Sequence, residues 1–132
     1  TAFKFVYPKR NGTLIDCTAL EAGQNGFSVG RLSEQMELVN CHALETGALG
    51  VYTKADGSRV ATICGFDIAG APGAATPKGI TLRGCTAMNT QHPGAMDFGL
   101  RCEAPPAGRE IKLIDCQGAG ARIGDIAGFA TE

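Results

Sequence analysis

The chain has 132 residues, of which 44% are apolar and 19% charged, and its formal net charge is -1. This composition predicts one folded domain with a buried core and excludes a disordered chain. The lysines and arginines are scattered, so no basic stripe is available and nucleic acid is not expected as a partner. No window of about 18 apolar residues exists, so no membrane span is expected. The start Thr-Ala-Phe has no charged segment followed by an apolar run and a cleavage site, so no signal peptide is expected.

Residues 1–11 are predicted to form an extended N-terminal arm. Phe3, Phe5 and Tyr7 alternate with other residues at the period of a strand, until Pro8 ends the pattern. One interpretation is that the arm covers the exposed strand edges at the first end of the domain. The other is that its aromatic side chains dock on another subunit. The second interpretation makes Phe3, Phe5 and Tyr7 candidate interface residues.

From residue 12 to the end, the chain repeats a short pattern centred on a cysteine. Alternating apolar residues lead into the cysteine, and a second strand begins about nine residues after it. Five copies are predicted: 13–17 with 26–29, 36–41 with 50–53, a degenerate copy around Cys64, 79–85 with 94–101, and 111–116 with 121–126. The period of 21 to 24 residues, with one step of 31 from Cys85 to Cys116, indicates a solenoid whose coils bury their apolar faces on one another.

Five of the six cysteines occupy or approach one position of this repeat. They are Cys17, Cys41, Cys64, Cys85 and Cys116. Equivalent residues of successive coils lie about 4.8 Å apart with their side chains parallel, which favours a ladder of small, buried, reduced thiols over disulfides. Cys102 lies outside this ladder, at the start of a predicted loop insertion at 102–110. It is the candidate for an exposed thiol or an intermolecular bond, and therefore for an interface residue.

On these repeats the chain resembles a right-handed parallel β-helix, the fold of pectin-lyase-like proteins and of many bacteriophage tailspikes. The resemblance covers residues 12 to 127 approximately and implies an all-β domain of about five coils spanning 12–132. Short phage proteins of this fold are commonly parallel homotrimers, so the resemblance also implies a trimer. The short predicted stack supports the same expectation, because a chain of this size buries only about two thirds of its unfolded surface and association would bury more.

No convergent catalytic or metal-binding set is visible in the sequence. Asp97 and Arg101 share the outer side of one predicted strand, with His92 just upstream, but they are about 13 Å apart along it. The equivalent positions of other predicted coils hold Ser28 and Tyr52, which provide no second carboxylate for acid and base roles. We therefore predict no catalytic residues, no metal ligands and no cofactor.

Two further residue pairs receive structural interpretations. Asp16 and Asp115 precede ladder cysteines at positions that Asn40 and Gly84 also occupy, which indicates turn formers. His42 and His92 are not spaced with carboxylates or with each other for a metal, so both are expected to be ordinary surface or turn residues.

The function expected from these observations is structural: a virion protein that decorates or cements a phage capsid, or forms a small spike, made in the host cytoplasm. Its expected partners are further copies of itself and capsid or other virion proteins. The alternative is a polysaccharide-degrading or carbohydrate-binding fragment of a tailspike or pectin-lyase-like protein, whose groove would need residues from additional coils or subunits. A surface adhesin repeat is a third class.

Overall fold

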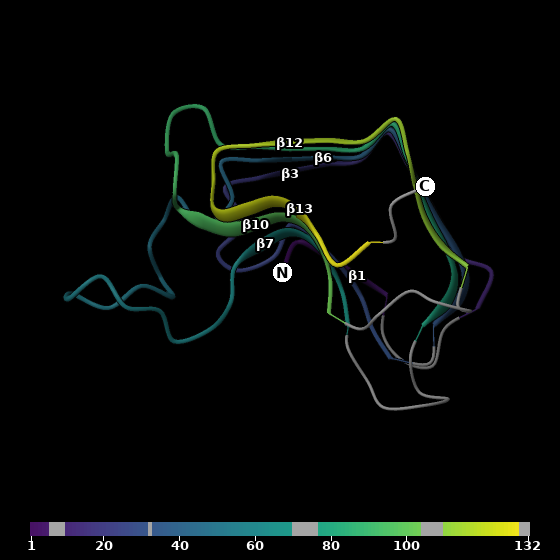
Figure 1. The fold of residues 1–132 in the computed structure, drawn as a ribbon, viewed down its shortest axis with the longest axis horizontal. Coiled ribbons are helices and arrows are strands. Elements are labelled where there is room, and N and C mark those ends of the chain that lie inside the picture. The colour runs from purple at the N-terminus through teal and green to yellow at the C-terminus, as the bar shows by residue number, and fades with distance from the viewer. Residues whose placement is uncertain (6–9, 32, 70–76, 104–109, 130–132) are drawn as a thin grey trace.

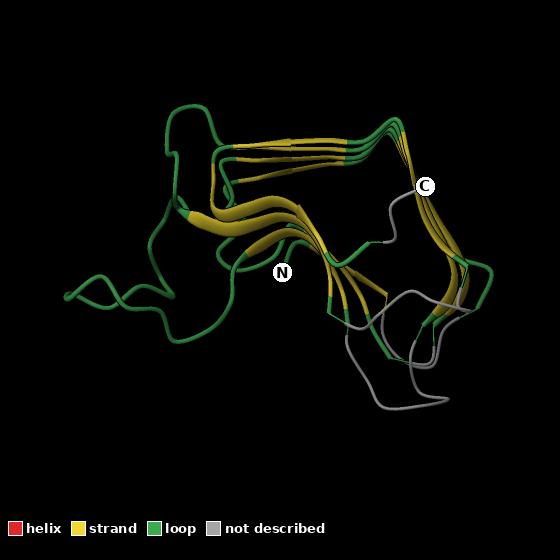
Figure 2. Cartoon of the chain, viewed as in Figure 1, coloured by secondary structure: helices red, strands yellow, loops and turns green. Residues whose placement is uncertain are grey.

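The strands of this chain run in one direction along three sheets, so that successive turns of the chain stack as coils (Figures 1 and 2). The structure is a computed structural model that describes residues 1–5, 10–31, 33–69, 77–103 and 110–129. All strand pairs within the three sheets are parallel. The prediction of an all-β parallel β-helix is confirmed.

Each complete coil contributes one strand to each of three sheets. Sheet B contains β2 (Thr13–Ile15), β5 (Glu34–Val39), β8 (Lys78–Arg83) and β11 (Ile111–Ile114). Sheet C contains β3 (Thr18–Leu20), β6 (His42–Leu44), β9 (Thr86–Met88) and β12 (Gln117–Ala119). Sheet A contains β1 (Phe3–Phe5), β4 (Phe27–Val29), β7 (Cys64–Ile68), β10 (Met96–Cys102) and β13 (Ala121–Ala127).

The corners of the coils recur because residues at the same positions of successive coils adopt a left-handed backbone conformation. Between sheets B and C these residues are Asp16, Asn40, Gly84 and Asp115, with φ of 55°, 52°, 62° and 53°. Aspartate, asparagine and glycine tolerate this conformation better than other residues. The interpretation of Asp16 and Asp115 as turn formers is therefore confirmed.

The core consists of identical or similar side chains stacked in rows along the coil axis. Leu14, Leu38, Leu82 and Leu113 are in register in sheet B. In sheet C the inward row is Ala19, Ala43, Ala87 and Gly118. In sheet A the rings of Phe3, Phe27 and Phe66 are stacked, with centroids 4.9 and 4.6 Å apart. Small side chains in sheet C allow the large rings of sheet A to fill the interior.

The structure has four complete coils and β1, which adds a fifth strand to sheet A, in agreement with a short stack of about five coils; the assignment of 50–53 and Cys64 to two separate copies was wrong. The segment 50–53, expected as the second strand of the Cys41 coil, lies in a long connection between β6 and β7. This connection carries a hairpin in which Thr53 and Arg59 form an antiparallel bridge, and it extends furthest to the left in Figure 1. Cys64 begins β7 and completes the Cys41 coil. The segment around Cys64, which the sequence suggested as a degenerate copy, is therefore the last strand of the Cys41 coil, and the long connection interrupts that coil.

The N-terminal arm forms part of sheet A. β1 pairs with β4 in register from Phe3 to Phe5, and both phenylalanines pack against the core. This arrangement agrees with the interpretation that the arm covers the first end of the domain. Tyr7 and most of the predicted loop insertion at 102–110 lie outside the described residues.

Candidate functional site

The outer face of sheet A carries a row of polar side chains, one from each of four neighbouring strands. Lys4, Ser28, Asp67 and Arg101 are in register across β1, β4, β7 and β10. Their neighbours along each strand, such as Phe27, Phe66 and Leu100, are buried. The alternation of a strand therefore places charged and hydroxyl groups together on the outside of this sheet.

Asp67 is the acid of this row, and its pKa is raised. Arg101 Nε lies 3.2 Å from its Oδ1, and Arg101 Nη2 lies 2.8 Å from the carboxylate of Glu103. Burial and the nearby charge of Glu103 raise the pKa of Asp67 to about 6, against the lowering effect of Arg101. Asp67 thus carries a proton near pH 6 and can donate it or a hydrogen bond to a ligand oxygen.

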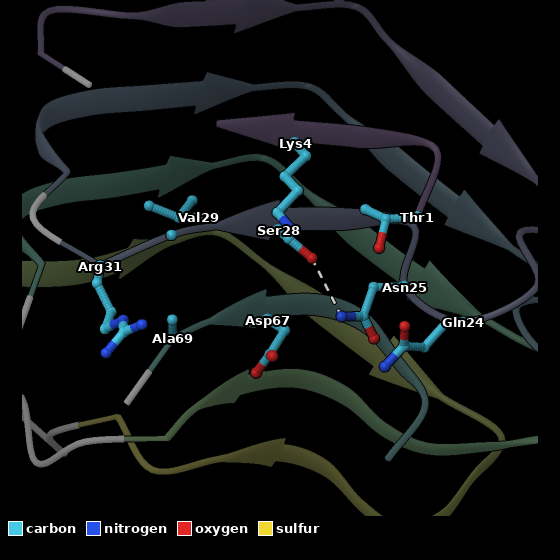
Figure 3. A pocket seen from close by; sticks show the side chains of 10 residues that line it. Thr1, Lys4, Gln24, Asn25, Ser28, Val29, Arg31, Asp67 and Ala69 are labelled. Atoms are coloured by element: carbon cyan, nitrogen blue, oxygen red, sulfur yellow. Dashed lines mark hydrogen bonds between the residues drawn. The ribbon is translucent and has the colours of Figure 1, made fainter. Parts of the chain in front are cut away.

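A cleft of ≈ 360 Å³ lies beside Asp67 and is lined mainly by polar residues (Figure 3). Asn25 donates from Nδ2 to Ser28 Oγ across 3.1 Å, which fixes both side chains at its wall. Lys4 and Arg31 add positive charge. A cleft of this size and polarity could hold a small hydroxylated ligand.

A second cleft, of ≈ 560 Å³, lies further along the same sheet, between it and the hairpin of the long connection. Asp97, which is 3% exposed, pairs with Arg59 Nε at 3.2 Å and with Arg122 Nη2 at 2.9 Å. Its Oδ2 accepts a hydrogen bond from the Ile63 N–H at 2.9 Å. This carboxylate is fully engaged and is poorly suited to act as a base.

The structure separates the three residues that the sequence placed nearest to an active site. Asp97 and Arg101 both lie on β10, but Asp97 pairs with Arg59 and Arg122, whereas Arg101 pairs with Asp67 and Glu103. His92 instead lies against Glu45, with Nδ1 3.4 Å from Oε1. Glu45 also accepts backbone hydrogen bonds from Thr90, Gln91 and His92, which makes this pair part of a turn.

Sequence reasoning missed Asp67 and Arg59. It aligned Tyr52 with Ser28, because the second strand was expected nine residues after Cys41, whereas the residue in register with Ser28 is Asp67. The signal that could have found Asp67 is the alternation of Cys64, Phe66 and Ile68, which matches Phe27 and Val29 of the preceding coil. Nothing in the sequence pattern brings Arg59 to Asp97.

The thiol ladder exists with four members: Cys17, Cys41, Cys85 and Cys116. Cys41, Cys85 and Cys116 each approach two carbonyl oxygens, one two residues earlier and one from the preceding coil. For Cys85 these are Arg83 at 3.6 Å and Leu38 at 3.3 Å. The ladder members are free thiols. Cysteine fits this corner because its weak donor reaches both carbonyls while its size suits the interior.

Two predictions about the remaining cysteines were wrong. Cys64 is not a ladder member, because it begins β7 in sheet A, in register with Phe98. Cys102 is not exposed: it is 4% accessible and lies in register with Ile68, which in turn pairs with Val29. The sequence around Cys102 was interpreted as the start of a loop, whereas β10 continues through it.

Within the described ranges, no three histidine, cysteine, aspartate or glutamate side chains are grouped so as to hold a metal ion. The same part of the chain contains no helix that could span a bilayer. The three parallel sheets and their repeated corners define the class of this chain as a parallel β-helix. No protein-family model, curated protein or solved structure matches it.

Proposed function

We propose that this chain is a structural protein that acts as a homotrimer, with a role in decorating or cementing a phage capsid or in forming a small spike. The observation that carries the proposal is a flat apolar row on the outer face of sheet C. Leu20, Leu44, Met88 and Ala119 are in register and stack along the coil axis. Leu20 is 66% exposed.

The row faces outward because the intervening residues Ala19, Ala43 and Ala87 fill the interior. Beside it runs a polar row in which His42 Nδ1 and Thr86 Oγ1 lie 2.6 Å apart. Apolar side chains aligned over several coils, with polar neighbours at the edge, are typical of a surface that associates with another protein. Because sheet C is flat and parallel to the coil axis, such association is lateral.

The strand count of the sheets argues against association end to end. Sheet A has five strands, whereas sheets B and C have four each. If β1 of one copy paired with β13 of another, sheets B and C would each lack one strand at the junction. The unpaired backbone groups there would be costly. Lateral packing around an axis parallel to the coils avoids this cost, and the resemblance to short phage β-helices favours three copies.

The molar mass in solution, measured by light scattering, tests this proposal. We expect a mass of three chains for the unmodified protein and a lower mass for Leu44→Glu, because the glutamate would place a charge in the middle of the apolar row. Thr81→Glu, on the outer face of sheet B, is the matched control and should keep the trimer. A monomeric unmodified protein would contradict the trimer.

The virion setting requires its own experiment. Gold-labelled antibodies against the chain should decorate intact particles of the phage that encodes it. Absence of label, together with absence of the chain from purified particles by mass spectrometry, would contradict a structural role in the virion.

The second candidate function is binding or cleavage of a polysaccharide at the cleft beside Asp67. The observation that favours it is a pair of carboxyl groups held by Arg101 on the outer face of sheet A: Asp67, whose pKa is raised to about 6, and Glu103. Screening polysaccharides for binding and for release of reducing ends tests this candidate. Loss of either signal in Asp67→Asn, with the trimer intact, would support it, and the absence of any signal would exclude it.

A further inference from the structure

The cleft between sheet A and the hairpin combines unbalanced positive charge with two exposed aliphatic side chains. Its floor contains two guanidinium groups, Arg59 and Arg122, and one carboxylate, Asp97. The side chain of Arg59 is 13% exposed and that of Asp97 is 4% exposed, so these charges are largely removed from water. The cluster therefore retains one net positive charge inside a cleft of ≈ 560 Å³.

Arg122 is the group that can meet a ligand. It uses Nε and Nη2 to bind Asp97 at 3.0 and 2.9 Å, and its side chain is 53% exposed. No described residue occupies its other terminal nitrogen. A guanidinium group offers five donors in a planar fork, so an arginine held by a carboxylate on one edge still presents donors on the other.

The lining of the cleft includes exposed aliphatic side chains from both the hairpin and sheet A, among polar residues. Val60, on the hairpin, and Ile123, on β13, are each 58% exposed, and Phe98 on β10 also lines the cleft, with the Arg101 guanidinium 5.2 Å from its ring centroid. Two large aliphatic side chains exposed at one cleft, next to a half-exposed arginine, favour a ligand that has an apolar body and an anionic end.

We propose that this cleft binds a monocarboxylate whose carboxylate is attached to an aromatic or aliphatic group. The carboxylate would accept hydrogen bonds from Arg122, and the apolar group would lie against Val60, Ile123 and Phe98. A single negative charge matches the net charge of the cluster. A dianion such as phosphate is disfavoured, because Asp97 would repel the second charge. Arginine also matches a carboxylate geometrically by paired hydrogen bonds.

Titration of the full chain with phenylacetate, followed by the backbone amide shifts of residues at the cleft, tests the proposal. We expect saturable shifts at Val60, Phe98, Arg122 and Ile123. Phenylacetamide has the same shape without the charge, and acetate has the charge without the ring. Both should bind at least about tenfold more weakly, which corresponds to the loss of one charge-assisted hydrogen bond or of one buried apolar group.

Arg122→Gln should weaken phenylacetate binding by about tenfold or more. Arg83→Gln, which removes an exposed arginine from the outer face of sheet B, is the matched control and should leave binding unchanged. Equal binding of phenylacetate and phenylacetamide, no saturable shifts, or unchanged binding by a folded Arg122→Gln variant would overturn the proposal. Light scattering distinguishes failure of this proposal from failure of the trimer. The proposed trimer contact lies on sheet C, so Arg122→Gln should keep the mass of the unmodified protein.

Discussion

The backbone N–H of Cys64 donates to Asn25 Oδ1 across 3.0 Å, although the two residues are 39 positions apart in the chain. Asn25 stands just before β4, and Cys64 is the first residue of β7. The side chain of Asn25, which is 7% exposed, therefore provides the acceptor for the first N–H of a strand that follows a long connection. This bond helps the interrupted coil to rejoin sheet A in register.

Replacing Asn25 should weaken the fold through this bond. Asn25→Ala leaves the buried N–H of Cys64 without an acceptor, so we expect a loss of about 1–3 kcal/mol in the free energy of unfolding. Ser28→Ala removes only the bond from Asn25 Nδ2 and should cost less than about 0.5 kcal/mol at this outer position. Denaturant unfolding of both variants measures the difference. Equal losses would show that the bond to Cys64 is not the important one.

Sheets A and C approach closely where a glycine of one faces an alanine of the other. A Cβ on Gly65 would lie 2.6 Å from Ala87 Cβ and 2.8 Å from the Gly99 carbonyl oxygen. We expect Gly65→Ala to cost about 1–3 kcal/mol or more through overpacking. Gly124→Ala is the control, since its nearest atom would be in Phe98 at 3.8 Å. A neutral Gly65→Ala in thermal unfolding would show that the sheets can separate at little cost.

The thiols of the ladder and of Cys64 should differ in reactivity. A hydrogen bond from Cys85 lowers the pKa of Cys116 to about 6, whereas burial raises the pKa of Cys64 to about 12. Because the thiolate is the nucleophile, iodoacetamide at pH 7 should modify Cys116 before Cys41, Cys64 and Cys85. Cys85→Ala removes the hydrogen bond and should slow the modification of Cys116. Peptide mass mapping over time measures the order of modification and the rate at Cys116 in both proteins. An unchanged rate at Cys116 in Cys85→Ala would show that the hydrogen bond from Cys85 does not lower the pKa of Cys116.

Asp67 should make the stability of the fold depend on pH between about 4 and 6. Its pKa is raised from 3.8 to about 6 in the folded chain, so folding takes up a proton in this range. The stabilisation from the protonated form is complete below pH 4 and is lost as the pH rises through 6. The change is on the order of 1–3 kcal/mol.

Asp67→Asn imitates the protonated form and should flatten this part of the stability curve. Denaturant unfolding at intervals between pH 4 and pH 7 measures both proteins. Titration of the Asp67 carboxyl carbon by NMR measures its pKa directly and so checks that Asp67 causes the pH dependence of stability. A midpoint below pH 4 would refute the raised pKa, whatever the stability curve shows.

The sequence predicted the features that recur in every coil. The alternation before each ladder cysteine located sheet B, and Asp16 and Asp115 were correctly interpreted as turn formers because only a few residue types tolerate a left-handed corner. These features are local, so a single coil contains all the information needed to recognise them.

The features that the sequence did not predict depend on chain segments that leave the coil. A connection of variable length follows Cys41, so counting nine residues forward led to a loop instead of β7. The same error placed Tyr52 instead of Asp67 opposite Ser28 and made the segment around Cys64 a separate copy of the repeat. Cys102 was misplaced for a related reason: the end of β10 is set by pairing with β7, a contact that no local pattern encodes.

The hairpin between β6 and β7 shows that one coil can be lengthened while its neighbours keep their register. Arg59 fastens its base by donating to the Ala95 and Gly94 carbonyl oxygens, whereas Asp56 and Gly57 at its tip are exposed. A foreign peptide spliced between Asp56 and Gly57 would leave those fastening contacts in place. The protein is thereby suited to serve as a display scaffold, in which an epitope or an affinity tag projects from a rigid stack of strands.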